Sequence, residues 1–389
     1  MRKLFLYGLM GFLPAISWSL QAQINPQFTE HVIPCTDSSL GQVFLSVNNL
    51  NYLRNYEYMS PIQYGYTLLG SQLSTQMAFQ ATPIMRVQAG VFMQHEFGSD
   101  GLQRIEPILS MKLSKRGYSF IFGALEGTVA HRLYEPLYNY ERIITHPIEN
   151  GFQFKTQKVN SWSDTWIQWE NRQRAGLMEQ ERLTAGHSSE WSVYRNGHWK
   201  VQLKPQGLIH HRGGQLSPSK MNVQSLLQVG IGARVQQTFY GQIRSWWFEP
   251  AYFYYNDLSN TKELPFNRGT GLYINAGIQT KWPVSVSAGY WNGNQFLSGR
   301  GGWLFASQAS PFGKPGYLEA KRELLMLRVL YQQSLSKGLN MDIRFEPYYD
   351  LGQQRLEYAY SLFLSYKFDF RLAKMAQEFL NGKAKVRQP

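Results

Sequence analysis

The segment from Arg355 to Phe370 carries an apolar or aromatic residue at every second position, and mostly polar residues lie between them. The apolar positions are Leu356, Tyr358, Tyr360, Leu362, Leu364, Tyr366, Phe368 and Phe370. This period of two predicts a β-strand, because successive side chains on a strand point to opposite faces. The segment is also longer than the usual strand of a soluble protein, which has about 3 to 10 residues.

The same alternation appears in residues 339–350, 271–282 and 199–209, and the polar face of the first carries Asp342, Arg344 and Glu346. Such a row of charges needs water or opposite charges nearby. A soluble sandwich with its polar face outside is one interpretation. The strand length and the aromatic residues near strand ends favour another, an outer-membrane barrel with aromatic girdles.

The connections between the predicted strands alternate between short and long, as in a closed meander with both chain ends in the periplasm. We therefore predict an all-β fold, a closed antiparallel transmembrane β-barrel of about sixteen strands, with fourteen as the alternative count. The predicted strands are about 42–51, 66–81, 84–97, 103–114, 118–129, 151–159, 163–172, 181–195, 198–210, 222–237, 242–256, 270–281, 283–296, 323–336, 339–350 and 355–370.

The amino terminus has the pattern of a secretory signal peptide, with Arg2 and Lys3 before an apolar run from Leu4 to Trp18. No other stretch is apolar for long enough to form a transmembrane helix. We expect a signal peptide at 1–22, a periplasmic arm at 23–41, the barrel at 42–370 and a basic periplasmic tail at 371–389. The expected location is the cell outer membrane.

The composition removes several classes of protein. The one cysteine, Cys35, cannot form an intramolecular disulfide, and no Cys/His spacing or glycine-rich turn indicates a zinc or nucleotide site. The formal net charge is +13, but an exported chain is directed away from nucleic acid. We expect no cofactor, no metal and no nucleic-acid partner.

The export signal, the alternating strands and the closing segment Phe368-Asp369-Phe370 resemble bacterial outer-membrane β-barrels of the porin-like kind. The resemblance implies a Gram-negative outer membrane, contact with its lipids and lipopolysaccharide, and recognition of the closing aromatic residue by the barrel-assembly machinery. Here nineteen residues follow that aromatic residue. The stretches at 164–170 and 210–215 also resemble uncharacterised barrels of Bacteroidota-type bacteria, which implies no activity.

The polar positions of the strands would line the lumen. The candidates are Arg86, Lys112, Lys200, Lys204, Arg234, Lys281, Arg328, Asp342, Arg344, Glu346, Glu357, Lys367 and Asp369. With further acids such as Asp164, Glu170 and Glu190, the predicted lining is nearly balanced in charge. These residues would either set the field of an open pore or brace the wall as cross-strand pairs.

His210, His211 and Arg212 lie where a strand enters an outer loop, which makes them candidates for a pore-mouth site. Adjacent strand residues point to opposite faces, so the two histidines chelate one metal only if the loop turns sharply. Ser188 and Glu190 share a face of the preceding strand with His210 beside them, which is the residue set of a hydrolase. Chance also supplies such sets readily.

The two longest outer loops, 130–150 and 293–322, contain many aromatic residues, including Tyr134, Tyr138, Tyr140, Trp303, Phe305 and Phe312. These side chains would stack on sugars, fold inward as a constriction, or pack on one another under the rim. We expect a channel for passive diffusion of small polar solutes and no enzyme. The alternatives are a lipid or lipopolysaccharide hydrolase and a plugged, non-conducting surface-binding barrel; the oligomeric state is not specified.

Overall fold

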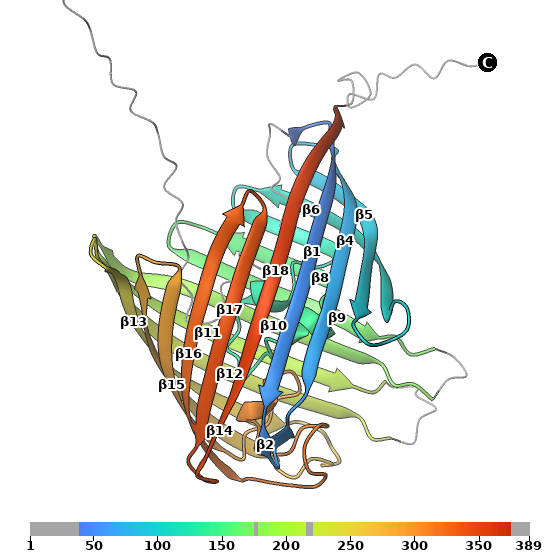
Figure 1. Ribbon diagram of the computed structural model, residues 1–389. Helices are drawn as coiled ribbons and strands as arrows, with labels where there is room; N and C mark the ends of the chain where they lie inside the picture. Colours follow the sequence, from blue (N-terminus) through green and yellow to red (C-terminus); the bar gives the residue numbers. More distant parts are fainter. Residues whose placement is uncertain (1–38, 175–177, 215–220, 375–389) are drawn as a thin grey trace, which may run out of the picture.

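Sixteen long strands form one closed antiparallel barrel in a computed structural model that describes residues 39–174, 178–214 and 221–374 (Figure 1). The barrel strands are β1 (Gln42–Glu57), β4 (Thr67–Gln80), β5 (Met85–Glu96), β6 (Arg104–Lys115), β7 (Tyr118–Ala124), β8 (Asn150–Gln157), β9 (Ser161–Asn171), β10 (Arg182–Asn196), β11 (Trp199–Arg212), β12 (Gln224–Thr238), β13 (Ile243–Asp257), β14 (Arg268–Thr280), β15 (Val284–Asn294), β16 (Lys321–Ser336), β17 (Leu339–Asp350) and β18 (Arg355–Lys374). The expected signal peptide, most of the arm and most of the tail lie outside the described residues.

Each barrel strand pairs with its neighbours in sequence, and β1 pairs with β18 to close the barrel. The predicted fold class and the count of sixteen strands are confirmed. The largest differences from the predicted boundaries are that β1 continues to Glu57, that β18 continues to Lys374, and that β7 ends at Ala124, where the chain turns into the lumen. A short hairpin of β2 (Met59–Ser60) and β3 (Gln63–Tyr64) extends the outer end of β1.

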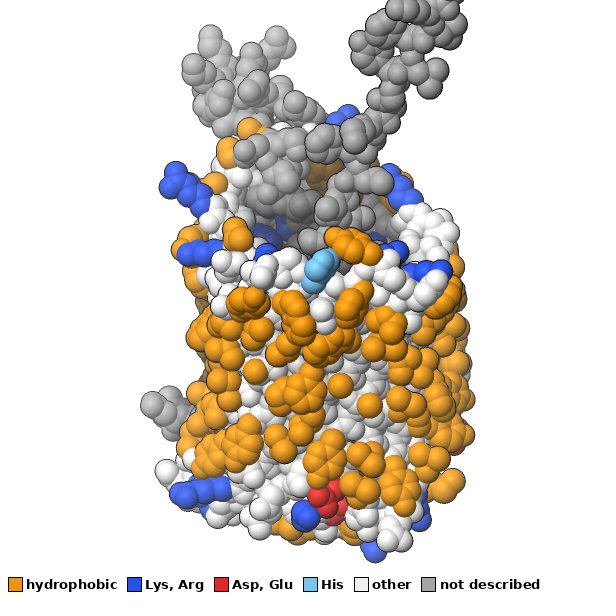
Figure 2. Space-filling model, turned by 90° about the vertical axis from the view of Figure 1, so that its left-hand side faces the viewer, with side chains coloured by type: hydrophobic (Ala, Val, Ile, Leu, Met, Phe, Trp, Pro, Cys, Tyr) orange, Lys and Arg blue, Asp and Glu red, His pale blue; other side chains and the backbone are white. Residues whose placement is uncertain are grey.

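The period of two separates a lipid-facing surface from the lumen. On β17, Ile343 is 42% exposed on the outside, whereas the neighbouring Arg344 is buried on the inside. Figure 2 shows the result on one face of the barrel, a band of hydrophobic side chains with Lys and Arg beyond both of its edges. Within the described ranges, no helix is long and apolar enough to span a membrane.

Two loops fold into the lumen and build its core. One is residues 125–149, between β7 and β8, with η3 (Thr128–His131) and α1 (Arg142–Thr145); the other is residues 295–320, between β15 and β16, with η4 (Trp303–Phe305). We call these segments the plug. Tyr134 of the first loop and Phe305 of the second belong to one buried cluster with Phe253 and Trp291 of the wall. Gly232 on β12 makes room for the plug, because a Cβ there would lie 1.9 Å from the Tyr134 hydroxyl.

We use two further terms for the ends of the barrel. The outer mouth is the end where the long connections and the β2–β3 hairpin lie, opposite the end where β1 begins and β18 ends (Figure 1). The inner mouth is the end with the tight turns. In outer-membrane barrels, long loops face the cell exterior and short turns face the periplasm.

Candidate functional site

Most lumen candidates from the sequence point inward. Seven of them are buried: Arg86, Lys204, Arg234, Asp342, Arg344, Glu346 and Glu357. Five are half-buried: Lys112, Lys200, Arg328, Lys367 and Asp369. Lys281 differs, because β14 ends at Thr280 and leaves Lys281 in an exposed turn, 4.8 Å from the ring of Trp282.

Several inward cations pair with an acid that the sequence analysis did not select. Glu249 of β13 accepts hydrogen bonds from Lys204 at 2.8 Å and from Arg234 at 2.9 Å, and the Tyr134 hydroxyl donates to it at 2.6 Å. The inward parity of β13 contained the signal for Glu249, since Trp247 and Ala251 beside it on that parity are buried. The plug is thus tied to the wall through a shared carboxylate.

Other partners come from the plug itself. The Glu126 carboxylate accepts hydrogen bonds from Lys112 at 2.5 Å and from Lys155 at 2.8 Å. Glu135 forms an ion pair with Arg328. Burial alone would raise the pKa of the Glu126 carboxyl, but the two lysines outweigh it and lower that pKa to about 2. Loop acids carry no periodic signal, so the strand pattern alone could not indicate them.

His131 fixes the first plug loop to the wall. Its side chain is fully buried, with Nδ1 at 2.9 Å from Asp164 and Nε2 at 2.8 Å from Glu149, and its ring stacks on Trp166 at 3.6 Å. Burial disfavours the charged ring, yet the two carboxylates prevail and raise the pKa of His131 to about 9. Gly127 keeps this contact close, because a Cβ there would lie 2.6 Å from Glu149.

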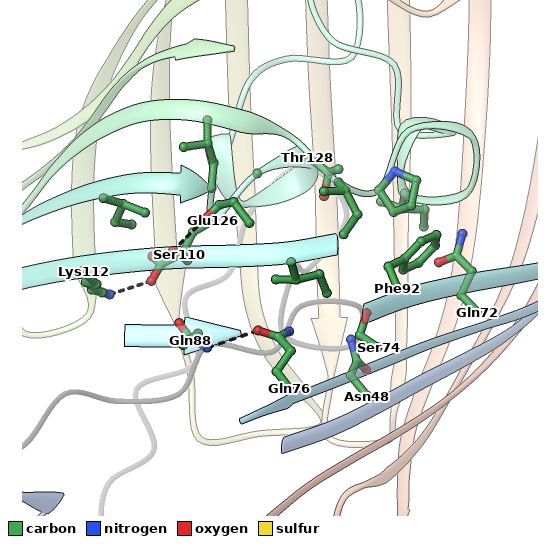
Figure 3. A pocket seen from close by; sticks show the side chains of 18 of the residues that line it. Asn48, Gln72, Ser74, Gln76, Gln88, Phe92, Ser110, Lys112, Glu126 and Thr128 are labelled. Atoms are coloured by element: carbon green, nitrogen blue, oxygen red, sulfur yellow. Dashed lines mark hydrogen bonds and ion pairs between the residues drawn. The ribbon is translucent and has the colours of Figure 1, made fainter. Parts of the chain in front are cut away.

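Beneath the plug, toward the inner mouth, lies a cavity of about 170 Å³ (Figure 3). Its polar lining consists mainly of neutral amides and hydroxyls, with a hydrogen bond of 3.3 Å between Gln76 and Gln88 and the Lys112–Glu126 pair at one side. The other polar lining residues that Figure 3 labels are Asn48, Gln72, Ser74, Ser110 and Thr128. A polar space of this size holds several water molecules.

At the outer mouth, three strands and the second plug loop bring four polar side chains together. They are Glu170 of β9, Thr184 of β10, His210 of β11 and Arg300. Thr184 Oγ1 lies 2.5 Å from Glu170, 3.0 Å from Nδ1 of His210 and 3.2 Å from Nε of Arg300. Arg300 also pairs with Glu170.

The hydrogen-bond pattern assigns the tautomer of His210. The Glu170 carboxylate only accepts, so the single hydroxyl hydrogen of Thr184 goes to it. The Thr184 oxygen must then accept from His210, which places the ring hydrogen on Nδ1 and leaves a lone pair on Nε2. None of the described residues donates to Nε2, and the His210 side chain is 14% exposed. His210 is therefore oriented as a base.

Arg142 and His146 of the first plug loop complete what we call the outer-mouth site, with Glu170, Thr184, His210 and Arg300. The charge of Arg142 acts on the rings of both histidines. Partial desolvation of its ring, together with the charges of Arg142, Arg300 and Arg104, lowers the pKa of His146 to about 4, so its ring is neutral at pH 7. Arg142 is buried; its Nη2 lies 3.7 Å from the Glu149 carboxylate, and its Nε has no hydrogen-bond partner within the described chain. A buried guanidinium Nε–H without an acceptor is suited to an anionic group.

The other pore-mouth candidates do not join this site. His211 points outward and contacts Ser225 at 2.9 Å, and Arg212 pairs with Glu263. Ser188 lies opposite Asp164 and Gln206, whereas His210 lies opposite Thr184, so the Ser188, Glu190 and His210 set does not assemble. Among described residues, no group of three or more His, Cys, Asp or Glu could hold a metal ion.

The closed barrel and its apolar outer band define an outer-membrane β-barrel protein. Comparison with solved structures leads to the same class of fold. The chain superposes on the outer membrane protein OprD from Pseudomonas aeruginosa with a TM-score of 0.53 and 12% identity, covering 87% of this chain and 97% of that one. A loop-deletion form of OmpT of Vibrio cholerae gives 0.50 and 8%, covering 84% and 99%. No curated protein matches the sequence significantly.

The particular family follows from the sequence. A model of the lipid A 3'-O-deacylase-type family matches residues 35–375, and the chain belongs to this family. The expectation that the protein is not an enzyme is therefore corrected: the family is one of hydrolases, although the barrel resembles porins in fold. Strand periodicity predicts the barrel wall but not an activity, and the arginines of the outer-mouth site lie in loops that carry no such period.

Proposed function

We propose that the protein hydrolyses an ester-linked acyl chain of a phosphorylated glycolipid of the lipid A type in the outer leaflet. The observation that carries the proposal is the chain of hydrogen bonds from His210 through Thr184 to Glu170, which ends in an open Nε2 at the outer mouth. An imidazole oriented through its other nitrogen is the usual arrangement of a general base. The family supplies the class of substrate.

The chemistry needs one water molecule and no covalent intermediate. Nε2 of His210 takes a proton from the water as the water oxygen attacks the ester carbonyl. The bond between the carbonyl carbon and the sugar oxygen then breaks, and His210 passes the same proton to the departing sugar alkoxide. The products are a free fatty acid and a sugar hydroxyl, and the base is regenerated.

The arginines supply the charge that this substrate requires. The Nε–H of Arg142, which has no partner among the described residues, is available to the oxyanion that forms on the ester carbonyl. Stabilisation of this kind is usually the largest single contribution to lowering such barriers. Arg182 also lies at the outer-mouth end of β10, where its positive charge favours the binding of a phosphate group.

The test is acyl release from purified lipid A in mixed micelles, followed by mass spectrometry of the lipid. Wild-type protein is expected to release one acyl chain per lipid, and His210→Gln is expected to be slower by about 100- to 10,000-fold. His211→Gln is the matched control, because this neighbour points outward and lies outside the site.

Intact lipid A after incubation with folded wild-type protein would contradict the proposal. Equal rates for His210→Gln and His211→Gln would remove His210 from the reaction. Folding of each variant is checked by its heat-modifiable migration in detergent gels, which reports a closed barrel.

Passive diffusion of small polar solutes has less support as the function. The charged lumen and the inner cavity favour water inside the barrel, but buried side chains of the plug occupy the outer half. Recordings in planar bilayers separate the two functions, because a channel shows stepwise conductance without any lipid substrate. Assembly by the barrel-assembly machinery is a further proposal, supported by the aromatic closing strand β18 and its pairing with β1.

A further inference from the structure

The lipid-facing side of β1 breaks the apolar rule of the barrel exterior. Its outward residues include Asn49, Asn51 and Asn55, whereas the residues between them in sequence, such as Leu50 and Tyr52, are buried in the lumen. On the neighbouring strand β4, the outward Ser71 accepts a hydrogen bond from Asn49 at 3.1 Å. We call Asn49, Asn51 and Ser71 the amide patch.

The amide patch lies near the middle of the bilayer. Asn51 is six residues from Glu57, where β1 ends at the outer mouth, and Asn49 is seven residues from Gln42 at the other end. With about 3.3 Å per residue and a tilt of about 40°, Asn51 lies about 15 Å below the outer end of β1. Lipid head groups and ester linkages lie closer to the interface, so lipids do not supply hydrogen-bond partners at this depth.

The internal hydrogen bonds satisfy the amide patch only in part. Asn49 donates to Ser71 and to the backbone oxygen of Gln72, and Asn51 donates to Asn49 at 2.6 Å. The side-chain oxygen of Asn51 accepts no hydrogen bond from the described residues, and one hydrogen of its amide is unused. Asn49 and Asn51 are both half-exposed. Such groups in hydrocarbon favour contact with another polar surface.

We propose that the amide patch is the contact surface between two copies of this chain. An amide both donates and accepts, so it can pair with a copy of itself across a two-fold axis along the membrane normal. Tilted strands cross at such an axis, and with Asn51 placed on it this amide meets its own copy while Asn49 and Ser71 lie beside the crossing. The patch has no net charge that would oppose such pairing. Outward apolar residues such as Leu53 and Leu73 flank the amide patch. They are uncharged, so they would pack against the same residues of a second copy without repulsion. This pairing does not depend on the proposed hydrolysis.

A second polar group on the lipid face provides a contrast. Thr165 and His187 are 2.8 Å apart on β9 and β10, and His187 Nε2 lies 3.3 Å from Ser189. Both ring nitrogens of His187 are therefore occupied, and Ser189 is fully buried. This group satisfies itself, whereas Asn51 leaves an acceptor and a donor open, so the dimer contact is assigned to β1.

Disulfide cross-linking in native membranes tests the contact in a Cys35→Ser background. Asn51→Cys is expected to form a covalent dimer on mild oxidation. Val229→Cys, equally lipid-facing but on β12, is expected to remain monomeric. Equal cross-linking of the two variants, or cross-linking of Asn51→Cys to a different protein alone, would overturn the proposal.

Native mass spectrometry of the protein in lipid nanodiscs gives a second readout. Wild-type protein is expected to be dimeric, and Asn49→Leu with Asn51→Leu is expected to reduce the dimer fraction at least tenfold while heat-modifiable migration is retained. Thr165→Val is expected to leave the dimer unchanged. A monomeric wild-type protein would overturn the proposal whether or not it hydrolyses lipid.

Discussion

The outer and inner halves of the lumen are built differently. In the outer half, the plug packs aromatic side chains and buried ion pairs against the wall, with His131 and Glu249 each held by two oppositely charged partners. In the inner half, amides and hydroxyls, together with Arg86 and the Lys112–Glu126 pair, line a cavity of about 170 Å³. Fully paired charges hold side chains in fixed positions better than single neutral hydrogen bonds do. The difference supports the proposal that the chemistry takes place at the outer mouth.

The largest effect is expected where a buried charge loses its partners in the outer half. His131→Ala leaves Glu149 and Asp164 without their shared cation in a fully buried place. Removal of one partner from a buried pair costs about 3 to 5 kcal/mol. Hydrogen exchange of backbone amides in residues 125–149 should rise strongly, while exchange in β14 to β18 stays unchanged. If residues 125–149 exchange at the same rate in the variant and in the wild type, His131 does not hold the plug in place.

The same contact predicts a pH window for the plug. The pKa of His131 is raised from 6.5 to about 9, so its stabilisation is complete below pH 6.5 and is lost as the pH rises through about 9. Burial raises the pKa of Glu149, but His131 and Arg142 outweigh it and lower that pKa from 4.5 to about 2. Stabilisation by Glu149 is complete above pH 4.5 and is lost as the pH falls toward 2.

Exchange in residues 125–149 should therefore be slowest between about pH 4.5 and 6.5, after correction for the intrinsic rate. The effect above pH 9 should disappear in His131→Ala. An acceleration above pH 9 of equal size in this variant would assign the change to another group.

A smaller effect is expected at the boundary of the two halves. Lys112→Met removes one of the two lysines that contact Glu126, but Lys155 remains, and all three side chains are partly exposed. We expect a loss of about 1 kcal/mol in unfolding free energy, which denaturant titration in detergent measures. A loss as large as that of His131→Ala would show that the inner half is as tightly held as the outer.

The smallest effect is expected inside the cavity. Gln88→Ala removes one neutral hydrogen bond to Gln76 beside water, so the unfolding free energy should change by less than about 0.5 kcal/mol. The same titration measures it. A large change would mean that the hydrogen bonds of the cavity lining contribute strongly to stability, and the contrast between the two halves of the lumen would then be weaker.

The sequence predicts the wall well, because the cause is local. The alternation in β17 and β18 depends only on residues that are neighbours in sequence. Because lipid lies outside the barrel and polar groups lie inside, the polarity of each residue indicates the face to which it points. The contacts of the plug are not local: His131 meets Glu149 and Asp164 from 18 and 33 residues away. Charge counting along strands therefore missed the acids that the loops supply.

The site was predicted only in fragments for the same reason. His210 stood out because two adjacent histidines end a strand, and Glu170 has the inward parity of β9. Thr184, Arg142 and Arg300 gave no signal, since a threonine in a strand and an arginine in a loop are ordinary. The pairing of β10 with β9 and β11 places Thr184 beside Glu170 and His210, and the folded plug adds Arg142 and Arg300.

The measurement that most directly tests the central claim is acyl release from lipid A in water enriched in heavy oxygen. Hydrolysis by water that His210 activates predicts one heavy oxygen atom in each released fatty acid from the first turnover onward, and none in the remaining sugar hydroxyl. The label and the release should both fall with His210→Gln and persist with His211→Gln. Released acid without the label, or no released acid from the folded wild-type protein, would contradict the account.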